Sequence, residues 1–124
     1  MNRVLITGGA GFIGSHTADL LLSQDVPVRV LDNLSSGNRT NLPDKHPLLE
    51  FIEGDITDSH MVDQAMIGVS HCLNLAAQVS VVASLENPEF SAMQNIIGFV
   101  NVLVAAQKNK VEKIVYASSA AIYG

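Results

Sequence analysis

The chain has 124 residues and a formal net charge of −5 at pH 7, with 48% hydrophobic and 15% charged residues. This length and composition predict a single α/β domain with a buried core, and they exclude a disordered segment. Lysine and arginine form no cluster that could neutralise a nucleic-acid backbone, so we expect no nucleic-acid partner.

Targeting and redox features favour a cytoplasmic location. The apolar run after residues 1–3 is too short for a signal-peptide core, and no uninterrupted apolar run reaches the roughly 18 residues of a membrane span, so we expect no membrane contact. The single cysteine, Cys72, excludes an internal disulfide, and its place in a predicted strand favours a buried thiol over a nucleophile. The histidines His16, His46, His60 and His71 show no metal-ligand spacing, so we expect no metal site.

A glycine-rich stretch follows the first apolar run, residues 4–6. Gly9, Gly11 and Gly14 match the G-x-G-x-x-G pattern, and Gly8, Gly11 and Gly14 match a three-residue glycine spacing. Such glycines allow a tight turn after a strand, close approach of a pyrophosphate to the backbone, and close packing of the following helix. The free N–H groups of that helix would bind phosphate oxygens, and the predicted contacts are Gly8, Gly11, Phe12, Ile13 and Gly14.

An acidic residue closes the second predicted strand. Asp32 lies 18 residues after Gly14, close to the spacing of about 20 expected for the acid that binds a ribose 2′-OH in dinucleotide-binding folds. The plainer alternatives are an ordinary strand-to-helix turn at the glycines and a solvated strand end at Asp32. The β-branched strand before the turn and the helical run after it favour the dinucleotide interpretation.

The remaining segments alternate between strand and helix patterns. In chain order the expected elements are a strand at 4–6, a helix at 12–24, a strand at 28–31, a loop at 33–47, a strand at 48–53, a short helix capped by Asp58, a strand at 72–75, a long helix at 88–109 and a strand at 114–117. The loop at 33–47 is either a cover over the adenosine end of a cofactor or a solvated connection.

This alternation predicts a Rossmann-type, doubly wound parallel sheet of about five strands in the order 3-2-1-4-5, with helices on both faces. One domain spans residues 1–124. In such sheets ligands bind beyond the carboxyl ends of the strands, where the glycine turn, Asp32, Asp55, residues 76–78 and residues 118–119 are expected to meet.

The long helix is apolar on most of its circumference. One stripe consists of Met93, Ile96, Ile97, Val100, Leu103 and Val104, and further apolar residues are Phe90, Phe99, Val102, Ala105 and Ala106. Such a helix requires two packing partners, of which the sheet is one. The other is a second subunit, which would give a homodimer through residues 88–109, another chain, or simply the interior of the same domain.

These segments resemble the amino-terminal part of the extended short-chain dehydrogenase/reductase family, and within it the NAD-dependent nucleotide-sugar epimerases and dehydratases of the UDP-glucose 4-epimerase type. The resemblance covers essentially the whole chain and rests on six motifs in the family's order. They are residues 7–16 for the cofactor loop, 32–37 for the adenosine ribose, 54–56 for the adenine, 75–78 behind the cofactor, Asn95 three residues before Gly98, and 118–124 at the fifth strand.

The resemblance implies NAD as the cofactor and a nucleotide sugar as the substrate. Besides the glycine turn and Asp32, the implied cofactor contacts are Asn33, Ser36, Gly37, Asp55, Ile56, Leu75, Ala76, Ala77, Gln78, Asn95 and Ser118. The resemblance places a catalytic role on Ser119 and substrate contacts on Ser80 and Ser84. The residue types leave plainer alternatives, because Gly-Asp pairs also begin turns and serines are ordinary loop residues.

Two departures from the family pattern stand out. Family members often have a histidine where this chain has Asn74. The family's catalytic Tyr-x-x-x-Lys pair follows the fifth strand by a few tens of residues, whereas Tyr116 has Ala120 four residues on and Tyr123 has no lysine after it. We therefore expect a truncated, cofactor-binding domain that lacks the substrate lobe and does not turn over sugar by itself.

The residues also favour one reaction and one cofactor. Dehydratases of the family place an acidic pair where this chain has Ala120 and Ala121, which favours epimerisation over dehydration. Asp32 favours NAD over NADP because a carboxylate would repel a 2′-phosphate, with Arg39 as the one residue that argues otherwise. A related reductase and a non-catalytic nucleotide-binding or regulatory module remain the alternatives.

Overall fold

The computed structural model describes residues 2–35, 37–76 and 88–116. In chain order its elements are β1 (Val4–Thr7), α1 (Phe12–Ser23), β2 (Val28–Asp32), the short 3₁₀ helix η1 (Arg39–Asn41), β3 (Leu49–Glu53), α2 (Ser59–Met66), β4 (His71–Asn74), α4 (Pro88–Lys108) and β5 (Lys113–Tyr116).

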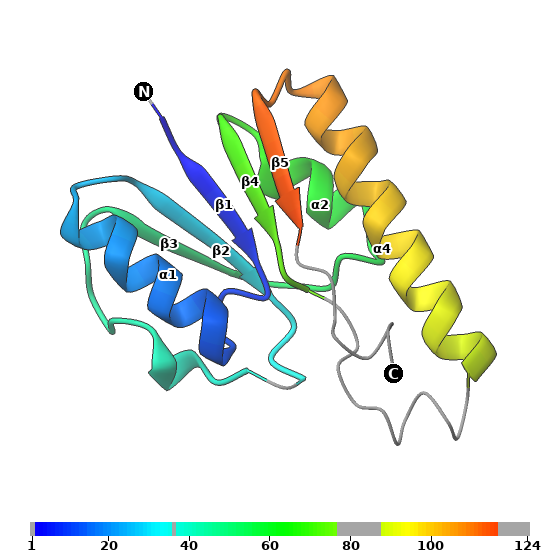
Figure 1. Cartoon of the computed structure of the whole chain (residues 1–124), viewed down its shortest axis with the longest axis horizontal. Coiled ribbons are helices and arrows are strands. Elements are labelled where there is room, and N and C mark those ends of the chain that lie inside the picture. The colour runs from blue at the N-terminus through cyan, green and yellow to red at the C-terminus, as the bar shows by residue number, and fades with distance from the viewer. Residues whose placement is uncertain (1, 36, 77–87, 117–124) are drawn as a thin grey trace.

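The strands form one five-stranded sheet in the order β3-β2-β1-β4-β5, and every neighbouring pair is parallel. Helix α1 covers one face of the sheet, and α2 and α4 cover the other (Figure 1). This arrangement confirms the predicted doubly wound fold. It also brings the carboxyl ends of β1, β2, β3 and β4 to the same edge of the sheet.

The core lies in two layers because successive strand residues point to opposite faces. Leu5 of β1 and Leu31 of β2 belong to the cluster under α2 and α4, whereas their neighbours Ile6 and Val30 belong to the cluster under α1. All four side chains are fully buried. The central strands are therefore apolar on both faces, which explains their continuous hydrophobic runs.

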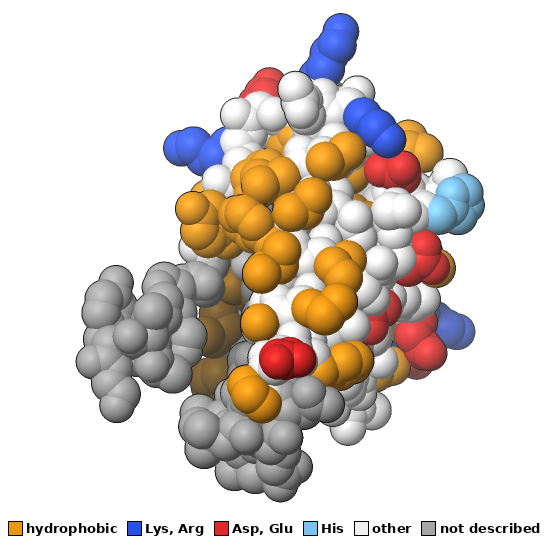
Figure 2. Space-filling model, turned by 90° about the vertical axis from the view of Figure 1, so that its right-hand side faces the viewer, with side chains coloured by type: hydrophobic (Ala, Val, Ile, Leu, Met, Phe, Trp, Pro, Cys, Tyr) orange, Lys and Arg blue, Asp and Glu red, His pale blue; other side chains and the backbone are white. Residues whose placement is uncertain are grey.

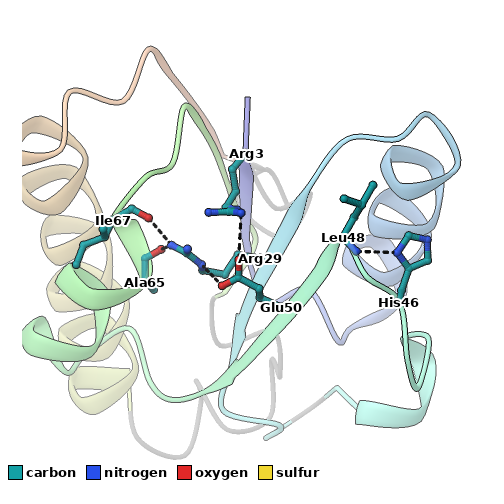
Figure 3. Close-up of polar contacts among 7 residues, drawn as sticks. All are labelled: Arg3, Arg29, His46, Leu48, Glu50, Ala65 and Ile67. Carbon is teal, nitrogen blue, oxygen red and sulfur yellow. Dashed lines mark hydrogen bonds and ion pairs between the residues drawn. The ribbon is translucent and has the colours of Figure 1, made fainter. Parts of the chain in front are cut away.

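A buried arginine joins β2 to the end of α2 (Figure 3). Arg29 donates from Nη1 to the backbone carbonyls of Ala65, at 2.7 Å, and Ile67, at 2.6 Å, and from Nε to the Glu50 carboxylate at 3.1 Å. Glu50 also forms an ion pair with Arg3, with 3.3 Å between Glu50 Oε1 and Arg3 Nη2. The guanidinium thus satisfies carbonyls that the helix end leaves without intrahelical partners. The sequence patterns did not predict this role for a strand residue.

The two sides of α4 differ in exposure. Val102, Ala105 and Ala106 are buried in the core cluster next to α2. The predicted apolar stripe instead faces outward, with exposed fractions from 38% at Ile97 to 62% at Ile96, and Phe90 is also exposed. Figure 2 shows hydrophobic side chains gathered along this face of the molecule. The small residues of α4 therefore pack inside, and the large ones form an exposed apolar surface.

Among the described residues, α4 is the one helix long and apolar enough to cross a membrane, judged by length and composition alone. This finding differs from the prediction of no membrane span, which rests on the lack of an uninterrupted apolar run of about 18 residues. Core helices of soluble proteins have the same length and composition but are mostly buried, whereas only 24% of the apolar stretch of α4 is buried, on the side that packs against α2.

The element boundaries differ little from those predicted. Strand β4 begins and ends one residue earlier than expected, β5 begins one residue earlier, and β3 begins one residue later. The expected end of β5, at position 117, lies outside the described residues. The loop at 33–47 contains η1, which the prediction missed and which begins where the Asn38 side chain accepts a hydrogen bond from the Thr40 N–H. As predicted, Asp58 caps α2 by accepting from the Met61 N–H.

Candidate functional site at the carboxyl edge of the sheet

The chain turns sharply after β1 at two adjacent glycines. Gly8 has a positive φ of 72°, and a Cβ there would lie 2.9 Å from the backbone nitrogen of Ala76. A Cβ on Gly9 would lie 2.7 Å from the Val30 side chain. Both positions therefore favour glycine, for different reasons, and the turn is compatible with both sequence alignments.

The next two glycines leave the start of α1 open. A Cβ on Gly14 would lie 2.6 Å from the carbonyl oxygen of Gly8, so this glycine allows the helix to pack on the turn. Gly11 precedes the helix, no side chain among the described residues caps it, and a Cβ there would meet only the Gly8 oxygen at 3.4 Å. Phe12 and Ile13 are 78% and 64% exposed. This helix end has the properties of a site for phosphate oxygens.

Asp32 faces the glycine turn, as predicted. Its Oδ2 accepts a hydrogen bond from the backbone N–H of Ala10 at 2.9 Å, and its Oδ1 accepts from the N–H of Leu34 at 2.7 Å. The residue is 7% exposed. The carboxylate therefore connects the ends of β1 and β2, and each oxygen retains capacity for a further hydrogen bond.

The segment after β2 packs on the same turn. The Ala10 carbonyl accepts from the Asn38 N–H at 3.0 Å and from Asn41 Nδ2 at 2.8 Å. A Cβ on Gly37 would lie 2.7 Å from the Ala10 carbonyl carbon. The backbone of this part of the 33–47 loop therefore lies directly against the glycine turn, while Asn38 and Asn41 are exposed to solvent.

Arg39, the residue that argued for a 2′-phosphate, has other partners. Its guanidinium lies 5.0 Å from the centroid of the Phe51 ring, and its Nη1 donates to the Pro43 carbonyl at 3.1 Å. This cation–π contact and hydrogen bond hold the side chain against β3.

Asp55 begins the turn after β3 and is connected to the end of β2. Burial raises the pKa of its carboxyl, but hydrogen bonds from the Thr57 N–H, from Asn33 and from the Thr57 hydroxyl outweigh that effect and leave the pKa below its ordinary value. The Asn33 amide donates to Asp55 Oδ2 at 3.1 Å. Ile56, by contrast, points its side chain into the core and is 9% exposed, so only its backbone faces this turn.

A threonine that the sequence patterns did not single out connects β1 to β4. The Thr7 hydroxyl donates to Asn74 Oδ1 and accepts from the N–H groups of Leu75 and Ala76, each at 3.1 Å. Both Thr7 and Asn74 are buried. The hydroxyl thus fixes the segment that follows β4, and Asn74 has a defined partner although the family often has histidine there. Only the type of residue, a hydroxyl at the end of a central strand, could have indicated this role.

The structure brings most of the described candidates to one edge. Contacts join the glycine turn to Asp32, to Gly37 and to the Leu75–Ala76 segment, and Asn33 to Asp55. Asn95 is exposed on α4, and its part in the site stays a prediction. The remaining candidates lie outside the described residues: Ser36, Ala77, Gln78, Ser80, Ser84, Ser118 and Ser119.

Cys72 is buried, and His46 and His71 each form a hydrogen bond with a neighbouring residue. Burial raises the pKa of the Cys72 thiol to about 12, which agrees with the predicted buried thiol. His46 accepts from the Leu48 N–H at 3.1 Å (Figure 3), and His71 pairs with Ser70 at 2.8 Å. Within the described ranges, no group of three or more His, Cys, Asp or Glu side chains could hold a metal ion.

The strand order, the glycine turn and the Asp32 carboxylate together define a dinucleotide-binding domain of the Rossmann type. The model of the NAD dependent epimerase/dehydratase family matches residues 4–124, and the chain belongs to this family.

Relatives and solved structures agree with this assignment. The chain is 40% identical to a UDP-glucose 4-epimerase of Mycolicibacterium smegmatis, over 98% of this chain and 40% of the relative. The Thermus thermophilus UDP-glucose 4-epimerase in complex with NAD is 41% identical over 94% of this chain and 37% of that one, with a TM-score of 0.85. The Thermotoga maritima UDP-glucose 4-epimerase with UDP-glucose is 39% identical over 94% of this chain and 38% of that one, with a TM-score of 0.86. The chain thus spans about two fifths of these relatives.

We expect Thr7→Val to lower the free energy of unfolding by about 1–3 kcal/mol, because it leaves the buried side chain of Asn74 and the partly buried N–H of Ala76 without their partner. Urea unfolding measures this change, and hydrogen exchange should show faster exchange of the Ala76 amide. Thr7→Ser retains the hydroxyl and is the matched control. Equal exchange of this amide in the Val and Ser variants would contradict the assigned role.

The Asp55 carboxylate should stabilise the fold in a pH-dependent way. Because its folded-state pKa is lowered, its contribution is complete above its ordinary pKa of 3.8 and is lost as the pH falls through the folded value. Asn33→Ala removes one hydrogen bond from the carboxylate, so NMR titration should give a higher pKa for Asp55, and acid unfolding should begin at higher pH. Asn2→Ala, at an exposed position near the amino terminus, is the control. An unchanged Asp55 pKa in Asn33→Ala would refute this account.

Proposed function

We propose that the chain is the NAD-binding portion of a nucleotide-sugar epimerase. The observation that carries this proposal is the uncapped start of α1 beside the Asp32 carboxylate, which the Ala10 N–H holds against the glycine turn. A pyrophosphate at the helix end and a ribose at Asp32 would satisfy both groups. Membership of the family and the NAD complex of the Thermus thermophilus neighbour support the same cofactor.

Each described element of the edge has a defined role in this proposal. The N–H groups of Phe12 and Ile13 bind the pyrophosphate, and Asp32 binds the adenosine ribose. The Gly11 N–H donates to the Gly8 carbonyl at 3.2 Å and holds the turn closed. The Asp55 turn receives the adenine, and the segment at Gly37 covers the adenosine end. NAD, when bound, supplies the acceptor for a hydride from the substrate.

Epimerisation is favoured over dehydration on the site residues. The positions after Ser119 are Ala120 and Ala121, which have no carboxyl group to assist the loss of water. The neighbours named UDP-glucose 4-epimerase, including one with UDP-glucose, support a nucleotide sugar as substrate. Ser119 would orient a sugar hydroxyl. These 124 residues contain no Tyr-x-x-x-Lys pair, so by themselves they bind cofactor without turnover.

A cytoplasmic location fits the unpaired, buried Cys72.

We expect calorimetry to show saturable binding of NAD to the 124-residue chain, with weaker binding of NADP because Asp32 repels a 2′-phosphate. Asp32→Asn should weaken NAD binding by roughly tenfold, as loss of a charge-assisted hydrogen bond predicts, and should reduce the preference for NAD over NADP. Asp19→Asn, at an exposed position on α1, is the control. A folded chain that shows no binding up to millimolar NAD would overturn the proposed function.

We infer that the outer side of α4 pairs with a second copy of the chain. Its exposed apolar residues form a continuous helical stripe. The exposed Tyr116 of β5, whose ring centroid lies 5.1 Å from that of Phe99 in α4, adds apolar area nearby. The charged residues of α4, Glu89 and Lys108, lie in its first and last turns, so the middle of the helix offers an uncharged surface. A two-fold symmetric pair would bury this surface on both copies.

Sedimentation velocity should therefore show a dimer of the wild-type chain at high concentration. Val100→Glu places a charge in the middle of the exposed stripe and should shift the chain to monomer. Leu20→Glu is the matched control, since Leu20 is a 59% exposed leucine on α1 and should leave the dimer intact. A wild-type chain that stays monomeric at all concentrations would contradict this inference.

A further inference from the structure

The turn after β3 is attached to α4 by one side-chain hydrogen bond. Asn101, in the second half of α4, donates from Nδ2 to the backbone carbonyl of Ile56 at 2.8 Å. Asn101 is partly buried, so solvent competes only weakly for this carbonyl.

The close approach of this turn to the helix depends on a glycine one helical turn earlier. A Cβ on Gly98 would lie 2.3 Å from Cδ1 and 2.6 Å from Cγ1 of Ile56. Gly98 and Asn101 are three residues apart and therefore lie on the same side of α4. The Ile56 side chain thus packs over Gly98 while its carbonyl bonds to Asn101, and the helix holds this residue at two points.

The same turn is connected on its other side to the candidate cofactor groups. Asp55 accepts from Asn33 at 3.1 Å, and the Gly54 N–H donates to the Asp32 carbonyl at 3.1 Å. The turn therefore lies between α4 and the strand end that carries the Asp32 carboxylate. A displacement at the Ile56 carbonyl would move the backbone next to Asp55.

We propose that Asn101 is a positioning residue for nucleotide binding. By fixing the Ile56 carbonyl, it keeps the backbone of residues 55–56 in the arrangement that receives the adenine end of the cofactor. Preorganised groups bind more tightly because the ligand does not bear the cost of ordering them. This inference rests on the proposed NAD binding.

The test compares two asparagines with the same hydrogen bond. Asn109, the first residue after α4, donates from Nδ2 to the carbonyl of Ala105 in the last turn of that helix, at 2.8 Å. This bond connects α4 to no other described element. Asn101→Ala and Asn109→Ala each remove one partly buried amide-to-carbonyl bond. The Ala105 carbonyl still accepts from the Asn109 N–H at 3.0 Å, so Asn109→Ala should lower the thermal stability less than Asn101→Ala. Asn101→Ala should weaken NAD and AMP binding by about fivefold, the equivalent of one such bond, whereas Asn109→Ala should change either by less than twofold.

A second substitution, Asn101→Asp, keeps the size of the side chain and replaces the donor with a carboxylate. Binding of AMP should weaken at least as much as in Asn101→Ala, and a well-folded Asp variant keeps the test decisive if the Ala variant does not fold. Wild-type affinity in the folded Asn101 variants, or an equal loss in Asn109→Ala, would overturn the positioning role alone. Failure of the wild-type chain to bind NAD would overturn the proposed function, and this inference with it.

Discussion

The hydrogen bond between the Ala10 N–H and the Asp32 carboxylate is the contact on which the candidate site depends. This bond connects the carboxyl ends of β1 and β2. The carbonyl of the same Ala10 accepts hydrogen bonds from Asn38 and Asn41. One residue of the turn therefore holds both the acidic strand end and the segment after it. Because Asp32 is nearly buried, its bond with the Ala10 N–H is shielded from solvent and keeps the turn in one arrangement.

The two edges of the sheet use different chemistry. At the carboxyl edge, backbone N–H groups, glycines and short polar side chains leave room for a ligand. Near the opposite edge, Arg29 donates both to Glu50 and to the carbonyls of Ala65 and Ile67 at the end of α2, as Figure 3 shows. A buried guanidinium is tolerated there because each of its bonds reaches a carbonyl or a carboxylate. Stability and binding are thus placed at opposite ends of the same strands.

The sequence predicted those features that depend on neighbouring residues. The glycine turn, the Asp58 cap and the alternation that determines strand order all follow from local patterns. The hydrogen bond between Thr7 and Asn74 joins residues 67 positions apart, and the bond between Arg29 and Ala65 joins residues 36 positions apart. No local sequence pattern contains such a pair. The orientation of α4 also could not be predicted, because periodicity finds an apolar face without saying which neighbour it meets. The side with small residues fits closely against α2, so the large residues face outward.

The exposed start of α1 has a consequence for how this protein can change during evolution. Its donors are main-chain amides, and the side chains of Phe12 and Ile13 extend away into solvent. Replacing these two residues would alter the shape and polarity around an anion without removing any group that holds it. We therefore expect divergence to be easier at these two outward positions than at Gly8, Gly9 and Gly14, where any side chain would collide with its neighbours.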